Sequence, residues 1–315
     1  MIGLIKNEVI KIFSRRLTKI LLILLVVFSI GAAILHKTQE TEITDWKANE
    51  MQIVADNKNR IELVNLSPQL KADAENKIKI SEYRLENNVK PIEENPWTAS
   101  LNLTGLIEMI IIVVIIIAAE IVSREFNDGT IKLLLIRPHK RSKILFSKYF
   151  SVIAFSTVAL LLMFFSQVIT NGFLYGFSNI FSGIVSTELF INSVGEVQAI
   201  SVVSQLVKLY GLSLISIMSY ATIAFSISTL LRNSSLAVGS SLVFMILGNS
   251  MIEATSTLPL LKYLPFANSD FSLHVYHLMP RPEMTIGFSV TVLLFYIVVL
   301  NMISFASFRK RDIIL

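Results

Sequence analysis

The chain has 315 residues, of which 53% are hydrophobic and only 16% are charged, and its mean hydropathy is +0.64. Soluble globular domains are about 25% charged, so this composition excludes a water-soluble enzyme. The absence of cysteine excludes disulfide bonds, thiolate zinc sites and thiol nucleophiles. The net charge of +5 does not indicate nucleic-acid binding, because the charges are sorted by their position relative to apolar segments.

Apolar segments that are long enough to cross a bilayer recur along the chain. About 20 helical residues, at about 1.5 Å each, cross roughly 30 Å of hydrocarbon. We therefore expect an all-α polytopic membrane protein with six transmembrane helices. The predicted spans are residues 17–35, 101–122, 144–170, 206–231, 236–252 and 286–306.

The positions of Lys and Arg predict that both termini are cytoplasmic. Sixteen of the 28 cations lie at the N-terminus, around the second connection, in the short fourth connection or in the tail. Most of the others lie between the first and second spans, in a segment that is net acidic. The predicted external segments are residues 36–100, 171–205 and 253–285, and the predicted cytoplasmic ones are 123–143 and 307–315.

Residues 1–16 have an amphipathic pattern. Ile2, Ile5, Val9, Ile12 and Phe13 recur at helical spacing, and polar side chains occupy the other face. The pattern predicts an interfacial helix that leads into the first span. Two roles stay open for this helix, namely an anchor that only fixes the first span and a direct contact with a partner.

The segment 36–100 is polar, rich in Glu, Lys and Asn, and free of glycine. Two stretches of helical periodicity lie within it, and Ser67 and Pro68 form the N-cap and first-turn proline of the second stretch. We expect an external helical hairpin that returns the chain to the second span. It is either a solvated spacer or a surface for substrate gating or partner binding.

No catalytic motif is visible. The 12 glycines include no phosphate-binding loop, so the chain cannot hydrolyse ATP by that route. His274 and His277 lie three residues apart but have no third ligand in view, so we predict no metal site. No hydrolase motif or paired carboxylates support an intramembrane protease or lipase.

Two carboxylates lie inside the second predicted span. Charged groups at this depth are costly and are functional candidates by default. Glu108, in the outer half, is a candidate for a polar translocation surface. Glu120, near the cytoplasmic end and four residues before Arg124, is predicted to form a structural ion pair with it.

The fourth predicted span carries four small hydroxyl side chains at 3-4-3 spacing, which places them on one helix face. Small residues at this spacing allow close packing against the fifth span. They are also candidates for the polar lining of a translocation path. The four residues are Ser219, Thr222, Ser226 and Thr229.

The connection between the second and third spans predicts a short amphipathic helix that starts after Asp128 or Thr130 and ends at Pro138. Its apolar face is formed by Ile131, Leu134 and Leu135. Such a helix either lies on anionic lipid or docks into a groove of a soluble partner.

This connection resembles the cytoplasmic loop of type-2 ABC exporter permeases. The pattern is Glu125-x-x-x-Gly129-Thr130-x-x-x-Leu134, followed by Arg137-Pro138, a basic cluster that contains Arg141, and Lys148 at the start of the third span. The sequence YRLENNVKP over residues 83–91 is similar to Gram-positive bacterial members of that family.

The resemblance implies a permease subunit of the bacterial plasma membrane that binds no cofactor itself. It would pair with a second permease, either a copy or a paralogue, and with two ATP-binding subunits that hold ATP and magnesium. The loop helix would couple the permease to those subunits. The coupling residues would be Glu125, Gly129, Thr130, Ile131, Leu134, Leu135, Arg137 and Pro138.

Two alternatives belong to other classes. One is a proton- or ion-coupled secondary transporter that uses Glu108 and Glu120, although no inverted repeat is visible. The other is a membrane scaffold or sensor that transports nothing. The substrate is equally open, and a peptide antibiotic, a lipid, a drug and an ion are all candidates.

Overall fold

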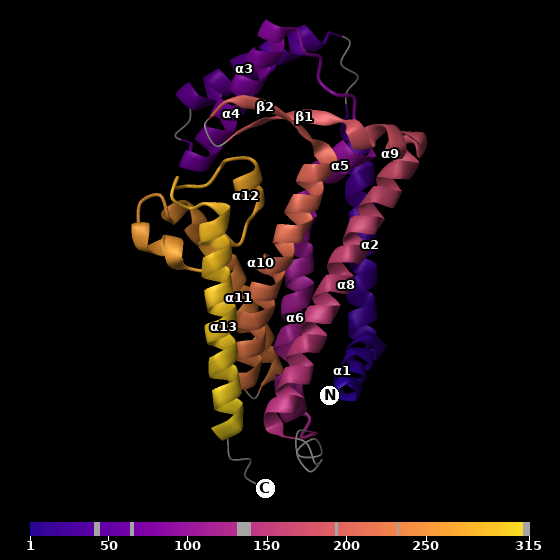
Figure 1. The fold of residues 1–315 in the computed structure, drawn as a ribbon, viewed down its shortest axis with the longest axis vertical. Helices are drawn as coiled ribbons and strands as arrows, with labels where there is room; N and C mark the ends of the chain where they lie inside the picture. Colours follow the sequence, from indigo (N-terminus) through magenta and orange to yellow (C-terminus); the bar gives the residue numbers. More distant parts are fainter. Residues whose placement is uncertain (41–44, 64–65, 131–139, 193–194, 232, 311–315) are drawn as a thin grey trace.

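A computed structural model describes residues 1–40, 45–63, 66–130, 140–192, 195–231 and 233–310. The described chain is mostly helical, and its long helices run roughly along the longest axis of the molecule (Figure 1). The N-terminus lies at the same end of the molecule as the C-terminal end of the last helix (Figure 1).

Within the described residues, five helices are long and apolar enough to cross a membrane. They are α2 (Arg16–Gln39), α6 (Ile107–Asn127) with the preceding turn η1 (Thr104–Leu106), α8 (Arg141–Tyr175), α10 (Val202–Leu230) and α13 (Ile286–Lys310). A sixth helix, α11 (Ser234–Ala254), has a shorter apolar stretch over Ser234–Gly248. The six predicted spans therefore coincide with six helices, of which five have the length and apolarity of a span.

Helix α6 is the centre of the bundle. Ile110, Val114, Ile117 and Val122 are completely buried along it, and α8, α10 and α11 pack around it. Most of α2 and α13 is exposed on the surface of the chain, as expected for helices that face lipid. The core therefore forms around the most apolar helix of the chain.

The second predicted span starts later than expected. Residues Pro96–Asn102 form a separate helix, α5, which η1 separates from α6. The Asn95 side chain caps the start of α5 by accepting hydrogen bonds from the backbone N–H groups of Trp97 and Thr98. Helix α6 begins only at Ile107, which places Glu108 in its first turn.

The third predicted span is longer than expected, since α8 has 35 residues and ends where Gly176 takes a positive φ of 93°. The following segment, expected as a plain loop, contains α9 (Ser178–Ser182), η2 (Gly183–Val185) and a pair of antiparallel strands. The strands are β1 (Thr187–Ile191) and β2 (Val197–Ser201), with Thr187 opposite Ser201 and Ile191 opposite Val197. This strand pair is a departure from an entirely helical chain.

The end of the molecule opposite the N-terminus is built from α3 (Trp46–Leu63), α4 (Pro68–Asn87) and the strand pair (Figure 1). Ser67 and Pro68 occupy the N-cap and first-turn positions predicted for them. Helix α4 is tied to α3 and to β1 by Arg84, which contacts Glu50 and Glu188. Two helices therefore occupy most of the segment expected to form a hairpin.

The last connection contains the short elements η3 (Pro259–Tyr263), η4 (Phe266–Asn268) and α12 (Ser272–Val275). His274 is buried there, and its Nε2 lies 3.0 Å from the Ser289 hydroxyl. Burial lowers the pKa of His274 to about 4, and His277 and Lys208 act in the same direction. His274 is therefore a buried histidine that is neutral at neutral pH.

Candidate functional site

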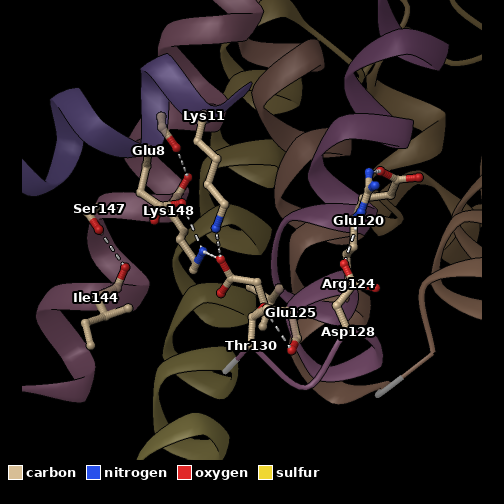
Figure 2. A network of polar contacts seen from close by, with 12 residues as sticks. Glu8, Lys11, Glu120, Arg124, Glu125, Asp128, Thr130, Ile144, Ser147 and Lys148 are labelled. Atoms are coloured by element: carbon tan, nitrogen blue, oxygen red, sulfur yellow. Dashed lines mark hydrogen bonds and ion pairs between the residues drawn. The ribbon is translucent and has the colours of Figure 1, made fainter. Parts of the chain in front are cut away.

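Four charged side chains meet at the end of the bundle that holds the N-terminus, and we call them the ion cluster (Figure 2). The Nζ atom of Lys148 in α8 lies 2.9 Å from Oε2 of Glu8 and 2.7 Å from Oε1 of Glu125. Glu125 lies in the last turns of α6, and Glu8 lies in helix α1 (Ile2–Ser14). Lys11, also in α1, donates a second hydrogen bond to Oε1 of Glu125. The cluster thus links three helices that are distant in sequence.

The ion cluster is buried and balanced in charge. The side chains of Lys148 and Glu125 are only 1% and 3% exposed, Glu8 is also buried, and Lys11 reaches in from the surface. A buried charge is costly unless it is paired, and removal of one partner leaves the other uncompensated. Two ammonium groups face two carboxylates here, so the position of each helix depends on the other two.

Packing of α1 against α8 brings Glu8 to Lys148. Ile12, one helical turn after Glu8, is almost fully buried, and the ring of Phe13 lies 5.6 Å from that of Phe155 in α8. The face expected to lie on lipid therefore partly contacts the bundle. The sequence signal that we missed is Glu8 itself, an acid on the same face as Ile12 in a helix otherwise flanked by cations.

A second group of ion pairs lies beside the cluster (Figure 2). Arg124 contacts Glu120 at 3.3 Å, as its four-residue spacing predicts, and contacts Asp128 at 3.5 Å. Arg15, at the junction of α1 and α2, lies 3.9 Å from the Glu120 carboxylate. These side chains are partly exposed, and such pairs stabilise by at most about 1 kcal/mol. They extend the contact between α6 and the N-terminal segment.

The connection predicted to couple to a partner begins a few residues after Glu125 of the ion cluster, where α6 ends. Gly129 has a φ of 68°, a left-handed conformation that favours glycine, and it ends α6. The Thr130 hydroxyl donates to the backbone oxygen of Glu125 at 3.4 Å. The remaining candidate coupling residues lie outside the described residues, and they are Ile131, Leu134, Leu135, Arg137 and Pro138. The ion cluster therefore holds together α6 and α8, the two helices that residues 128–140 join in sequence.

Glu108 is remote from the ion cluster, at the other end of α6. With Asp270, Tyr220, Ser213 and Ser216 it lines a cavity of about 80 Å³. Glu108 itself is exposed on the surface of the single chain. The structure thus places Glu108 beside a second carboxylate and several hydroxyl groups, which the sequence did not connect with it.

The four hydroxyl residues of α10 lie inside the bundle and line neither this cavity nor the larger one described below. The Thr222 hydroxyl lies 2.8 Å from that of Tyr149 in α8, and the Ser226 hydroxyl donates to the backbone oxygen of Leu300 in α13. The Thr229 hydroxyl donates to its own helix, and Ser219 is buried. Thr222 and Ser226 thus bond to α8 and α13, and α10 also packs against α11.

Comparison with known proteins identifies relatives along the whole chain. The profile of a family described as "Protein of unknown function (DUF2705)" matches residues 75–314. The "Uncharacterized protein YhcI" of Bacillus subtilis (strain 168) is 33% identical over 320 residues, which cover 99% of both chains. The "Uncharacterized membrane protein YdbK" of the same organism is 28% identical over 220 residues, or 69% of this chain and 81% of YdbK. With its apolar helices, this chain is a multi-pass membrane protein that belongs to the DUF2705 family.

Proposed function

We propose that this chain is the membrane permease subunit of an ATP-driven exporter, whose ATP is hydrolysed by a separate subunit. The proposal assigns six spans to the chain, with both termini in the cytoplasm and the α3–α4 region outside the cell. It assigns the coupling role to residues 125–138. It also assigns a second permease and two ATP-binding subunits as partners.

The observation that carries the proposal is the ion cluster. A coupling element must pass a displacement to the spans, which requires a stiff connection at the membrane end of the loop. Lys148 and Glu125 hold α8 and α6 together where the loop leaves them, and Glu8 adds α1. A displacement of residues 128–140 would therefore move three helices together.

The distribution of charge and helix length supports the assigned topology. Helix α11 has 21 residues, which at about 1.5 Å each give roughly 30 Å, enough for a sixth span. Six spans place both termini on one side, and the N-terminus and the C-terminal end of α13 lie at the same end of the molecule (Figure 1). Within the described residues, the cations of α1, of the start of α8 and of the end of α13 lie at that end, as the positive-inside rule requires of the cytoplasmic side (Figure 1).

The test is purification of the tagged chain from its own host in mild detergent. We expect an ATPase subunit with a phosphate-binding loop to be retained in stoichiometric amount, and the complex to hydrolyse ATP. Transport by the chain alone, driven by a proton gradient without ATP, would instead support the secondary-transporter alternative. Recovery of the chain without an ATPase and without transport activity would support the scaffold alternative.

A further inference from the structure

A large cavity lies at the end of the molecule that carries α3, α4 and the strand pair. Its volume is about 580 Å³, which lies within the range of small-molecule binding sites, roughly 300 to 1,000 Å³. Residues of α3, α4, α5 and β1 line it, so its walls come from segments far apart in sequence. Much of the wall is apolar and includes Ile80, Leu101, Leu189 and Phe190.

Most charged side chains in the wall already have partners. Lys77 lies 2.7 Å from Asp73, and Arg84 is shared between Glu50 and Glu188. Because Arg84 is already shared between two carboxylates, it does not compensate the remaining acid of the wall. Arg60, which also lines the cavity, is exposed.

Glu94 is different from these residues. Its carboxylate accepts hydrogen bonds from the Thr98 hydroxyl at 2.7 Å and from the Asn102 amide at 2.9 Å. Within the described part of the chain, no cationic side chain makes an ion pair with it. Glu94 therefore supplies the cavity with a half-buried carboxylate that lacks a counter-ion.

Burial makes the negative charge of the Glu94 carboxylate costly. Burial is the main cause that raises the pKa of Glu94, and the nearby carboxylates of Glu40 and Glu188 act in the same direction. The Thr98 hydrogen bond and His36 oppose these effects without reversing them. A cation bound beside this carboxylate would offset the cost of burying its charge.

We propose that this cavity binds an amphipathic organic cation, whose ammonium group contacts the Glu94 carboxylate and whose apolar body packs against Leu101 and Phe190. The negative charge of Glu94 favours a ligand with a positive charge, and the apolar wall favours a ligand whose remaining atoms are apolar. Binding requires only this chain. It is therefore independent of the ATPase subunit and of the proposed transport function.

The test uses the full chain in lipid nanodiscs, with binding measured by titration calorimetry at neutral pH. The probes are 4-phenylbutylammonium, the uncharged 4-phenylbutanol and the anionic 4-phenylbutyrate, and protein-free nanodiscs correct for partition into lipid. We expect the ammonium probe to bind about tenfold more tightly than the alcohol, since a charge-assisted hydrogen bond has that strength. We expect Glu94→Gln to abolish this preference.

Glu93→Gln is the matched control, because Glu93 is the adjacent acid and its side chain is 87% exposed. This variant should keep the preference for the ammonium probe. Equal binding of ammonium and alcohol to the wild-type chain would overturn the proposal without any variant. Retention of the preference in Glu94→Gln, or tighter binding of the anionic probe, would also overturn it.

Discussion

Lys148 is the shared partner of the two buried carboxylates in the ion cluster. Its replacement by Met keeps the length of the side chain but leaves Glu8 and Glu125 buried without their shared ammonium group. The cost of breaking a buried pair in this way is about 3–5 kcal/mol. We expect Lys148→Met to lower the thermal unfolding temperature markedly in detergent, and to lower the yield in the membrane.

Lys143→Met is the matched control, since Lys143 lies in the same helix but is exposed. It should unfold at nearly the wild-type temperature. Adding Glu125→Gln to Lys148→Met should recover part of the loss, because one of the two buried charges is removed. If Lys148→Met were as stable as Lys143→Met, the ion cluster would not hold the helices together.

His274 predicts a defined dependence of stability on pH. Its pKa is lowered to about 4 in the folded chain, against an ordinary value of about 6.5. The unfolded chain therefore binds a proton first as the pH falls, so His274 contributes stability above pH 6.5 that is lost between about 6.5 and 4. We expect His274→Gln to lose less stability than the wild type over this window, as measured by chemical unfolding at each pH.

His277→Gln is the comparison for that measurement. His277 is more exposed than His274. Partial burial of its ring lowers its pKa, but less than full burial lowers the pKa of His274. Its replacement should leave most of the acid destabilisation in place. Identical pH dependence in the wild type and His274→Gln would contradict the assignment of a buried neutral histidine.

At the scale of elements, the proposed external location of α3 and α4 can be tested by labelling. The chain contains no cysteine, so a single introduced thiol reports one position. Within α3, Asn57 is a poor position for this thiol because its side chain is only 7% exposed and its amide donates to the backbone oxygen of Ile53 at 2.8 Å. Asn59 in the same helix is exposed.

We expect Asn59→Cys to react with an impermeant maleimide on intact cells. Lys143→Cys, near the cytoplasmic end of α8 in the proposed topology, should react only after the cells are permeabilised. The reverse pattern would invert the proposed topology.

The sequence predicted elements whose signal is local. Helices α2 and α13 appear as continuous apolar runs, and the start of α4 appears in its capping serine and first-turn proline. The two strands were missed because each has five residues and partly exposed positions, so neither shows a long alternation. The break before α6 was missed because η1, at residues 104–106, lies inside the segment that reads as one apolar run from Leu101.

The candidate site was predicted only in part, for a related reason. The pattern of the connection singled out Glu125 and Lys148, and four-residue spacing correctly placed Arg124 beside Glu120. Glu8 joins Lys148 across 140 positions of sequence, and only the packing of α1 on α8 creates that pair. Likewise, the unpaired state of Glu94 depends on where every nearby cation lies, and a single sequence does not contain that information.

At the scale of the whole molecule, two candidate functional regions lie at opposite ends of one bundle. The ion cluster is at the end that holds the N-terminus, and the large cavity is lined by α3 and α4, which lie at the opposite end (Figure 1). Helix α6 has Glu125 in its last turns and Glu108 in its first, and α8 begins beside the cluster and ends near α9. In the proposed exporter, these two helices connect the ATP-dependent end of the molecule to the ligand-binding end.

The central claim is that residues 125–138 couple this chain to an ATPase subunit, and one variant tests it directly. Leu134→Asp puts a charge on the predicted apolar face, and Lys132→Asp puts the same residue on the predicted polar face of the same segment. The measurement is ATPase subunit retained, and ATP hydrolysed, per purified permease. We expect Lys132→Asp to match the wild type and Leu134→Asp to lose at least about tenfold in both, because a buried unpaired charge disrupts a docked contact. Wild-type retention and hydrolysis with Leu134→Asp would contradict the coupling role.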